Sequence, residues 1–111
     1  MPHKFIFKLD DIPEPGGKSI QLVTADGKQE AFIIRYAAEV RVYVNSCPHT
    51  GVSLNWADDQ FFDYEDKFIQ CSLHGALFGP LDGRCVRGPC LGESLQSISF
   101  ELVGRQVIIY I

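Results

Sequence analysis

The feature that most constrains this chain is a pair of short motifs, each of which combines a cysteine with a histidine. The first is Cys47–His49 (CPH) and the second is Cys71–His74 (CSLH). Thiolate sulfur and imidazole nitrogen are ligands that bind transition metals. Gly51 and Gly75 follow the two motifs closely, and glycine lets a loop turn tightly around a bound group. Two such loops that converge predict one metal centre with two sulfur and two nitrogen ligands.

Length and composition are typical of one small folded domain. The chain has 111 residues, of which 46% are hydrophobic, and this suits a single modest core. It has no apolar run near the roughly 20 residues that a membrane-spanning helix needs. The segment Met1–Lys8 lacks the long apolar stretch and the cleavage site of a secretory signal. We therefore expect a cytoplasmic protein that does not bind a membrane.

Charge and cysteine content narrow the choice of partner and compartment. The formal net charge is −4, whereas nucleic-acid-binding domains carry basic patches, so we expect no nucleic acid partner. An acidic chain is suited to docking on a basic protein surface. Four cysteines in a chain without a secretory signal favour metal ligands or thiols over a disulfide framework.

The pattern along the chain is typical of strands, and no segment has a convincing helical period. Val40, Val42 and Val44 alternate with polar or aromatic residues, which predicts a half-buried strand that leads directly to Cys47. Other short apolar segments are bounded by turn signals such as Asp26-Gly27. About ten short strands at this spacing predict an all-β fold, an antiparallel sandwich or barrel.

The two motifs resemble the ligand loops of Rieske ferredoxins, and Gly88-Pro89 resembles the proline-bearing loop that covers the cluster in that family. The resemblance implies one [2Fe–2S] cluster, with Cys47 and Cys71 on the inner iron and His49 and His74 on the outer iron. It also implies a single Rieske domain over residues 1–111. A small cluster-binding subdomain of loops and hairpins would span about 46–90, and a base sandwich would comprise 1–45 and 91–111.

Departures from the family pattern bear on the potential of the cluster. High-potential members have a further cysteine in each ligand loop, where this chain has Val52 and Leu73. They also have a serine and a tyrosine whose hydroxyls donate to sulfur, where this chain has Ala76 and Phe78. Fewer hydrogen bonds leave more negative charge on sulfur, which predicts a low potential. The spacer at residues 50–70 is longer than in a compact member of the family, which predicts an extended hairpin around Trp56 to Lys67.

The resemblance implies an electron carrier. The sequence shows no nucleophile or general base arranged for bond making, so we do not expect an enzyme. The carrier would take single electrons from a flavin-dependent reductase and pass them to a terminal oxygenase or a similar acceptor. In the proteins that it resembles, the histidine-ligated iron lies at the tip. His49 and His74 are therefore the predicted exit point for the electron.

Three other interpretations stay open from the sequence. The small subunit of nitrite reductase shares the fold, although those subunits often lack the ligands. A structural zinc module could use the same two cysteines and two histidines. An all-cysteine cluster would add Cys85 and Cys90, which we otherwise expect to be small buried residues. The acidic segment 57–67 is either a solvated loop or a docking patch for a basic reductase.

Overall fold

A computed structural model describes residues 4–46, 61–63, 67–71, 75–88 and 91–110 of the chain, and these residues form nine β-strands. The strands are β1 (Lys4–Lys8), β2 (Gly16–Thr24), β3 (Gly27–Tyr36), β4 (Glu39–Val44), β5 (Ile69–Gln70), β6 (Leu77–Phe78), β7 (Cys85–Arg87), β8 (Phe100–Val103) and β9 (Gln106–Tyr110). One 3-10 turn, η1 (Leu9–Asp11), follows β1. The predicted all-β fold is confirmed. Within the described part of the chain, no helix has the length and apolar character needed to cross a membrane.

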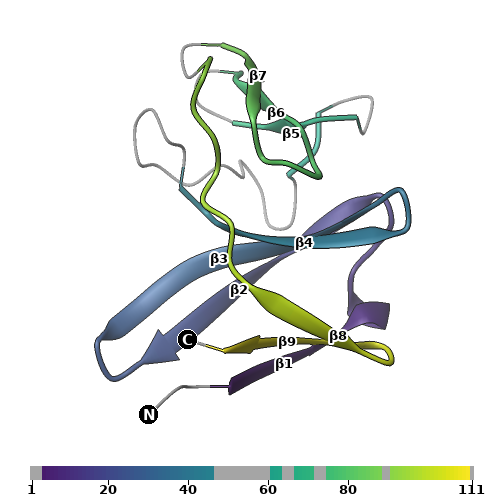
Figure 1. Cartoon of the computed structure of the whole chain (residues 1–111), viewed down its shortest axis with the longest axis vertical. Helices are drawn as coiled ribbons and strands as arrows, with labels where there is room; N and C mark the ends of the chain where they lie inside the picture. Colours follow the sequence, from purple (N-terminus) through teal and green to yellow (C-terminus); the bar gives the residue numbers. More distant parts are fainter. Residues whose placement is uncertain (1–3, 47–60, 64–66, 72–74, 89–90, 111) are drawn as a thin grey trace.

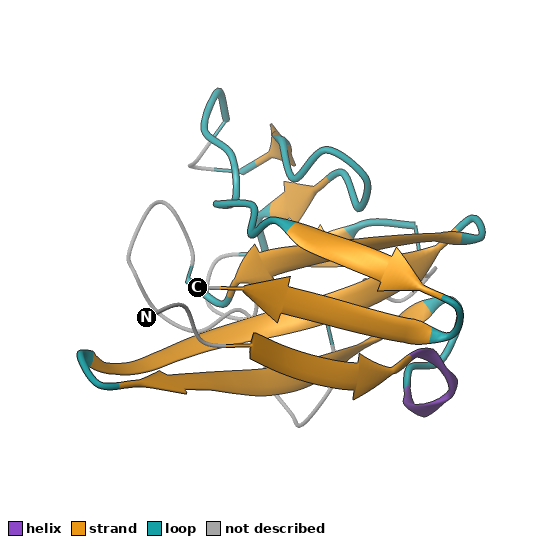
Figure 2. Ribbon diagram, turned by 60° about the horizontal axis from the view of Figure 1, so that its bottom comes forward, coloured by secondary structure: helices purple, strands orange, loops and turns teal. Residues whose placement is uncertain are grey.

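The strands form three antiparallel sheets of three strands each. We call them the terminal sheet (order β1-β9-β8), the central sheet (order β2-β3-β4) and the small sheet (order β5-β6-β7). Figure 1 shows the terminal and central sheets together in the lower part of the molecule and the small sheet above them. Figure 2 shows the long strands of the first two sheets stacked as layers. The antiparallel sandwich that the sequence predicts is therefore the terminal sheet packed on the central sheet.

β3 and β4 of the central sheet each bury side chains on both faces, which the alternation in β4 does not predict. Val40 and Val42 face the core shared with the terminal sheet, as expected. Tyr43, expected on the solvent side, is only 1% exposed because it faces a second core shared with the small sheet. The same two-sided burial explains the continuous apolar run at 31–34 in β3, whose successive side chains enter the two cores alternately. The predicted strand and the burial of Val40 and Val42 are therefore confirmed, and the solvent-facing position of Tyr43 was wrong.

The segment between β7 and β8 ties the small sheet to the sandwich. The backbone N–H of Val44 donates to the carbonyl of Gln96 (2.9 Å), and that of Ile98 donates to the carbonyl of Val42 (2.9 Å). Tyr43 and Ser97 form the bridge between these bonds. The chain thus runs along the edge of β4 before it enters β8, and it ties the small sheet to both sheets below it.

Arg35 fixes the loop that follows η1 onto the end of β3. Its Nη1 donates to the carbonyl oxygens of Leu9 (3.2 Å) and Ile12 (2.9 Å), and its Nη2 lies 3.6 Å from Oε1 of Glu14. Ile12 is 1% exposed and lies in the core between the terminal and central sheets. One partly buried guanidinium therefore donates to two backbone carbonyls outside the strands, and the carbonyl of Leu9 also accepts from the N–H of Ile12 (3.1 Å).

The described part of the acidic segment forms a hairpin with the strand that precedes Cys71. The backbone N–H of Asp63 donates to the carbonyl of Phe68 (2.8 Å), and that of Gln70 donates to the carbonyl of Phe61 (2.8 Å). Asp63 Oδ1 also accepts from the backbone N–H groups of Lys67 (2.9 Å) and Phe68 (3.1 Å). Asp63 therefore closes the turn of this hairpin and is not simply a solvated charge.

Two aromatic side chains fasten this hairpin to the central sheet. Phe61 is 1% exposed and stacks on Phe32 of β3, with ring centroids 4.4 Å apart. Phe62 stacks on Tyr36 at the end of the same strand, with ring centroids 5.9 Å apart. The segment between the two cysteine–histidine motifs thus carries an anchor for the small sheet, a role that its acidic composition does not indicate.

Candidate metal centre

The second predicted ligand loop leaves β5 and returns as β6, and it is closed by two backbone hydrogen bonds. The N–H of Cys71 donates to the carbonyl of Ala76 (2.8 Å), and the N–H of Gly75 donates to the carbonyl of Cys71 (3.0 Å). Gly75 has φ of +67°, a conformation that favours glycine. Cys71 follows β5 directly, as the sequence predicts, and it is the one predicted ligand among the described residues.

The other three predicted ligands, Cys47, His49 and His74, lie outside the described residues. The chain approaches the first of them along β4, and Asn45 then donates its backbone N–H to the carbonyl of Glu30 (3.0 Å). The described residues contain no group of three or more candidate metal ligands. This is expected, because Cys71 is the one predicted ligand among them.

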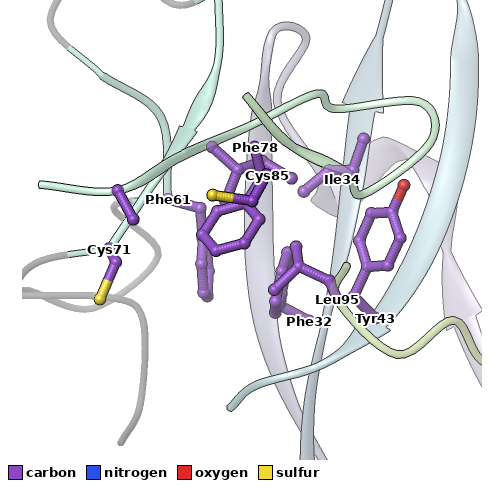
Figure 3. Packing of buried hydrophobic residues seen from close by; sticks show 10 residues of the cluster. Phe32, Ile34, Tyr43, Phe61, Cys71, Phe78, Cys85 and Leu95 are labelled. Carbon is purple, nitrogen blue, oxygen red and sulfur yellow. The ribbon is translucent and has the colours of Figure 1, made fainter. Parts of the chain in front are cut away.

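The surroundings of Cys71 are apolar and closely packed. Cys71, Ala76 and Phe78 are each 0% exposed and belong to the core that joins the small sheet to the central sheet. Figure 3 shows Cys71 at one end of this core, with Phe61, Phe78 and Cys85 between it and Tyr43. Neither Ala76 nor Phe78 carries a hydroxyl, so neither can donate a hydrogen bond to a sulfur atom from this wall.

β7 leads to the predicted third loop, and it is paired with β6 on one side and bonded to residues 93–95 on the other. The register between β6 and β7 shifts, so that Leu77 and Phe78 face the three residues 85–87. Cys85 is 2% exposed, as expected of a small buried residue, and its Sγ lies 3.4 Å from the carbonyl oxygen of Arg87. The backbone N–H of Cys85 donates to the carbonyl of Glu93 (2.9 Å), so the chain before the third loop is bonded to the chain after it.

Tyr43 holds the connection between β6 and β7 against the central sheet. Its hydroxyl donates to the carbonyl of Pro80 (2.9 Å), and Nε of the neighbouring Arg41 donates to the carbonyl of Leu81 (3.0 Å). Burial raises the pKa of Tyr43 to about 12, so the phenol stays protonated and remains a donor at neutral pH. Sequence reasoning missed this residue because the period of β4 placed it on the outer face.

The remaining residues that the sequence indicates fall into two groups. Arg84 lies immediately before β7 and Arg87 is its last residue, and both are exposed. His3, Trp56, Cys90, Pro89 and the acidic residues Asp58, Asp59, Glu65 and Asp66 lie outside the described residues. A docking role for the acidic segment therefore stays a prediction.

Comparison with protein families gives a clear result. The family model described as "Rieske [2Fe-2S] domain" matches residues 4–109, which is nearly the whole chain. The chain is a member of the Rieske [2Fe–2S] domain family. The resemblance inferred from the two motifs and from Gly88-Pro89 is therefore confirmed, and with it the expectation of one [2Fe–2S] cluster, the group for which this family is named. A search of curated proteins finds no match to the chain.

Solved structures show the same fold in this Rieske family. The terminal oxygenase of carbazole 1,9a-dioxygenase from Novosphingobium sp. KA1 matches with a TM-score of 0.78 and 20% identity, over 98% of this chain and 30% of that chain. The ferredoxin of carbazole 1,9a-dioxygenase from Nocardioides aromaticivorans IC177 matches with a TM-score of 0.72 and 21% identity, over 97% of this chain and 95% of that chain. This Rieske chain thus spans less than a third of the oxygenase and nearly all of the ferredoxin.

The described residues fit a Rieske cluster. A cysteine ligand has to be held as a thiolate in a defined position, and Cys71 leaves a strand into a loop closed by two backbone hydrogen bonds. The buried apolar wall beside Cys71 excludes water from one side of the loop. Among the described residues Asn45 is the one buried polar or charged residue, so no described carboxylate is buried beside Cys71.

Proposed function

We propose that this Rieske protein is a ferredoxin, an electron carrier without a catalytic site of its own. The observation that carries the proposal is the match to the Rieske domain family over residues 4–109. The near-complete coverage of a free ferredoxin by the same fold supports it further. When bound, a [2Fe–2S] cluster supplies reversible transfer of one electron. The chain's own residues have to hold the cluster, keep water from it and leave one side open to a partner.

The ligands in this proposal are Cys47, His49, Cys71 and His74. The two cysteine thiolates hold the inner iron, and the two histidine imidazoles hold the outer iron. The hydrogen-bonded loop from Cys71 to Ala76 supports the second pair, because it fixes the direction in which the Cys71 side chain leaves β5. The division into a cluster-binding subdomain at 46–90 and a base sandwich from 1–45 and 91–111 is part of the same proposal.

The potential of the proposed ferredoxin lies at the low end of the family range, which runs from about −150 to +300 mV. Ala76 and Phe78 support this, because both are fully buried beside Cys71 and neither carries a donor. Each hydrogen bond that a sulfur atom lacks leaves more negative charge on it and makes the added electron less favourable. A midpoint potential well above 0 mV in redox titration would contradict this part of the proposal.

The proposed partners are a flavin-dependent reductase as donor and a terminal oxygenase or a similar acceptor. A solved complex of reduced oxygenase and oxidized ferredoxin in carbazole 1,9a-dioxygenase contains a chain that matches with a TM-score of 0.70 and 17% identity, over 94% of this chain and 96% of that chain. That complex supports an oxygenase as acceptor. A cytoplasmic location, tested by cell fractionation, completes the proposal.

The first experiment is metal analysis and spectroscopy of the protein purified without oxygen. We expect a brown protein with two iron atoms and two inorganic sulfides per chain, and an electron paramagnetic resonance signal after reduction. A colourless protein with one zinc ion per chain would support the structural zinc module and would overturn the ferredoxin proposal.

A second experiment separates the proposed ligand set from an all-cysteine cluster. Cys71 and Cys85 are both buried cysteines of the same core, so each serves as a control for the other. We expect Cys71→Ser to abolish or strongly alter the visible spectrum and Cys85→Ala to leave it unchanged. Loss of the cluster in Cys85→Ala, with the fold intact by circular dichroism, would favour an all-cysteine cluster instead.

A further inference from the structure

Gly88 lies unusually close to the loop that follows Cys71. It is exposed, yet a Cβ built on its backbone would lie 2.8 Å from Cα of Ala76 and 3.0 Å from Cβ of Ala76. Real Cβ atoms are essentially never found as close as the first of these distances, and the atom approached is backbone, which cannot rotate away. The backbone at Gly88 therefore packs directly on Ala76.

Ala76 is the residue that closes the second ligand loop. Its carbonyl accepts the backbone N–H of Cys71 (2.8 Å), and its side chain is completely buried. A shift of Ala76 would consequently move the hydrogen bond that fixes Cys71. Ala76 thus links Gly88 to Cys71, because it contacts Gly88 and accepts the backbone N–H of Cys71.

The segment on the Gly88 side has little freedom to retreat. β7 pairs with β6, and the residues before Gly88 are bonded to the return strand through Cys85 to Glu93 (2.9 Å) and Leu95 to Gly83 (2.8 Å). The turn after Gly88 is closed by the N–H of Leu91, which donates to the carbonyl of Gly88 (3.2 Å). A side chain added at position 88 therefore has to displace Ala76 or break these hydrogen bonds.

We propose that Gly88 is a positioning residue for the cluster: its backbone contact with Ala76 holds the segment after β7 against the second ligand loop and fixes the backbone at Cys71. This inference rests on the proposed function, because it takes Cys71 as a cluster ligand. Gly88 has φ of +112°, so a glycine would also be favoured there for its conformation alone. The experiment therefore has to separate the contact from the conformation.

Gly92 provides that separation in the same part of the chain. It has φ of +97°, and a Cβ built on it meets nothing within 4 Å. Gly92→Ala thus carries backbone strain without the contact, whereas Gly88→Ala carries both. We expect a chelator to remove iron from Gly88→Ala about tenfold faster than from wild type, at the low end of the effect of residues that orient metal ligands. Gly92→Ala should stay within about twofold of wild type, because its strain is remote from the ligand loop.

Electron paramagnetic resonance of the reduced protein gives a second readout that general destabilisation would not move. We expect altered g values in Gly88→Ala and wild-type g values in Gly92→Ala. Ala76→Gly removes Cβ, one of the two close atoms of Ala76. The double variant Ala76→Gly/Gly88→Ala should therefore lose iron more slowly than Gly88→Ala, though faster than wild type. If Gly88→Ala does not fold, Ala76→Val tests the same contact from the other side, without strain at position 88.

The outcomes distinguish this inference from the proposed function. A wild-type protein without iron and sulfide would overturn the ferredoxin proposal itself. A wild-type protein with its cluster, combined with Gly88→Ala that behaves like Gly92→Ala in both readouts, would overturn only the positioning role. Ala76→Val with wild-type iron loss and g values would overturn it equally.

Discussion

Replacing Tyr43 by phenylalanine removes a single oxygen atom from the interface between the central sheet and the small sheet. The Tyr43 hydroxyl is the donor to the carbonyl of Pro80 (2.9 Å), and the ring packs against Phe32 with centroids 5.7 Å apart. The ring contact survives in the variant, while the carbonyl loses its donor in a buried setting. We expect Tyr43→Phe to lower the free energy of unfolding by about 1–3 kcal/mol at pH 8.

The same substitution should change how stability depends on pH. Burial raises the pKa of Tyr43 to about 12, whereas an unfolded tyrosine ionises near its usual value of 10.0. Below the unfolded pKa both states are neutral, so the stabilisation is fully present there. Between the two values only the unfolded chain has lost the proton, and the free energy of unfolding falls by about 1.4 kcal/mol per pH unit. Over this window the wild type should lose about 3 kcal/mol that Tyr43→Phe does not lose.

Urea denaturation of the cluster-loaded protein at several pH values between 8 and 12 measures both effects. The advantage of wild type over Tyr43→Phe should be constant up to about pH 10 and should then fall by about 3 kcal/mol towards pH 12, which cancels or reverses it. Tyr110→Phe is the matched control, since Tyr110 is 46% exposed, and it should lie within about 0.5 kcal/mol of wild type at pH 8. A difference between wild type and Tyr43→Phe that does not change with pH would refute the reasoning.

Three further outcomes follow from other contacts. Arg35→Met should lower the free energy of unfolding by about 1–2 kcal/mol in urea denaturation, because the carbonyl of Ile12 loses the Arg35 donor and that of Leu9 keeps only the N–H of Ile12; an unchanged midpoint would contradict this. Arg105→Ala should leave the midpoint unchanged, because its ion pair with Asp10 is exposed. Ala76→Ser and Phe78→Tyr introduce the hydroxyls of high-potential relatives. Each should raise the midpoint potential by about 40–60 mV if the hydrogen bond from the new hydroxyl to sulfur favours the reduced cluster by about 1–1.5 kcal/mol. A fall in potential would contradict the proposed hydrogen bond to sulfur.

Much of the fold follows from local patterns that the sequence displays directly. The strand that leads into the first motif, the hairpin at Asp26-Gly27 and the break after β7 at Gly88 all lie where periodicity and turn residues predict them. These features depend on residues that are close together in the chain, so a short window contains the necessary information. The same holds for the direct passage from β5 into Cys71.

The errors and omissions have one physical cause, which is contact between residues that are distant in sequence. Alternation in β4 places Tyr43 on an outer face, yet the small sheet, built from residues some 30 positions later, covers that face and buries it. The acidic segment gives no sign that Phe61 stacks on Phe32 and that Asp63 closes a turn. Periodicity shows which side of a strand differs from the other, but not what packs on either side.

The sequence by itself therefore determined the chemistry that this protein offers and its all-β class. Two cysteines and two histidines in CPH and CSLH motifs, with Gly88-Pro89 downstream, pointed to a Rieske family that the comparison confirms. Only the tertiary structure decided how that chemistry is held: two strands, β3 and β4, that bury side chains in two cores, a hydrogen bond from Tyr43 to Pro80, and a glycine packed on Ala76 next to the loop of Cys71. Ligand type is a property of single residues, whereas close packing is a property of pairs that only the folded chain brings together.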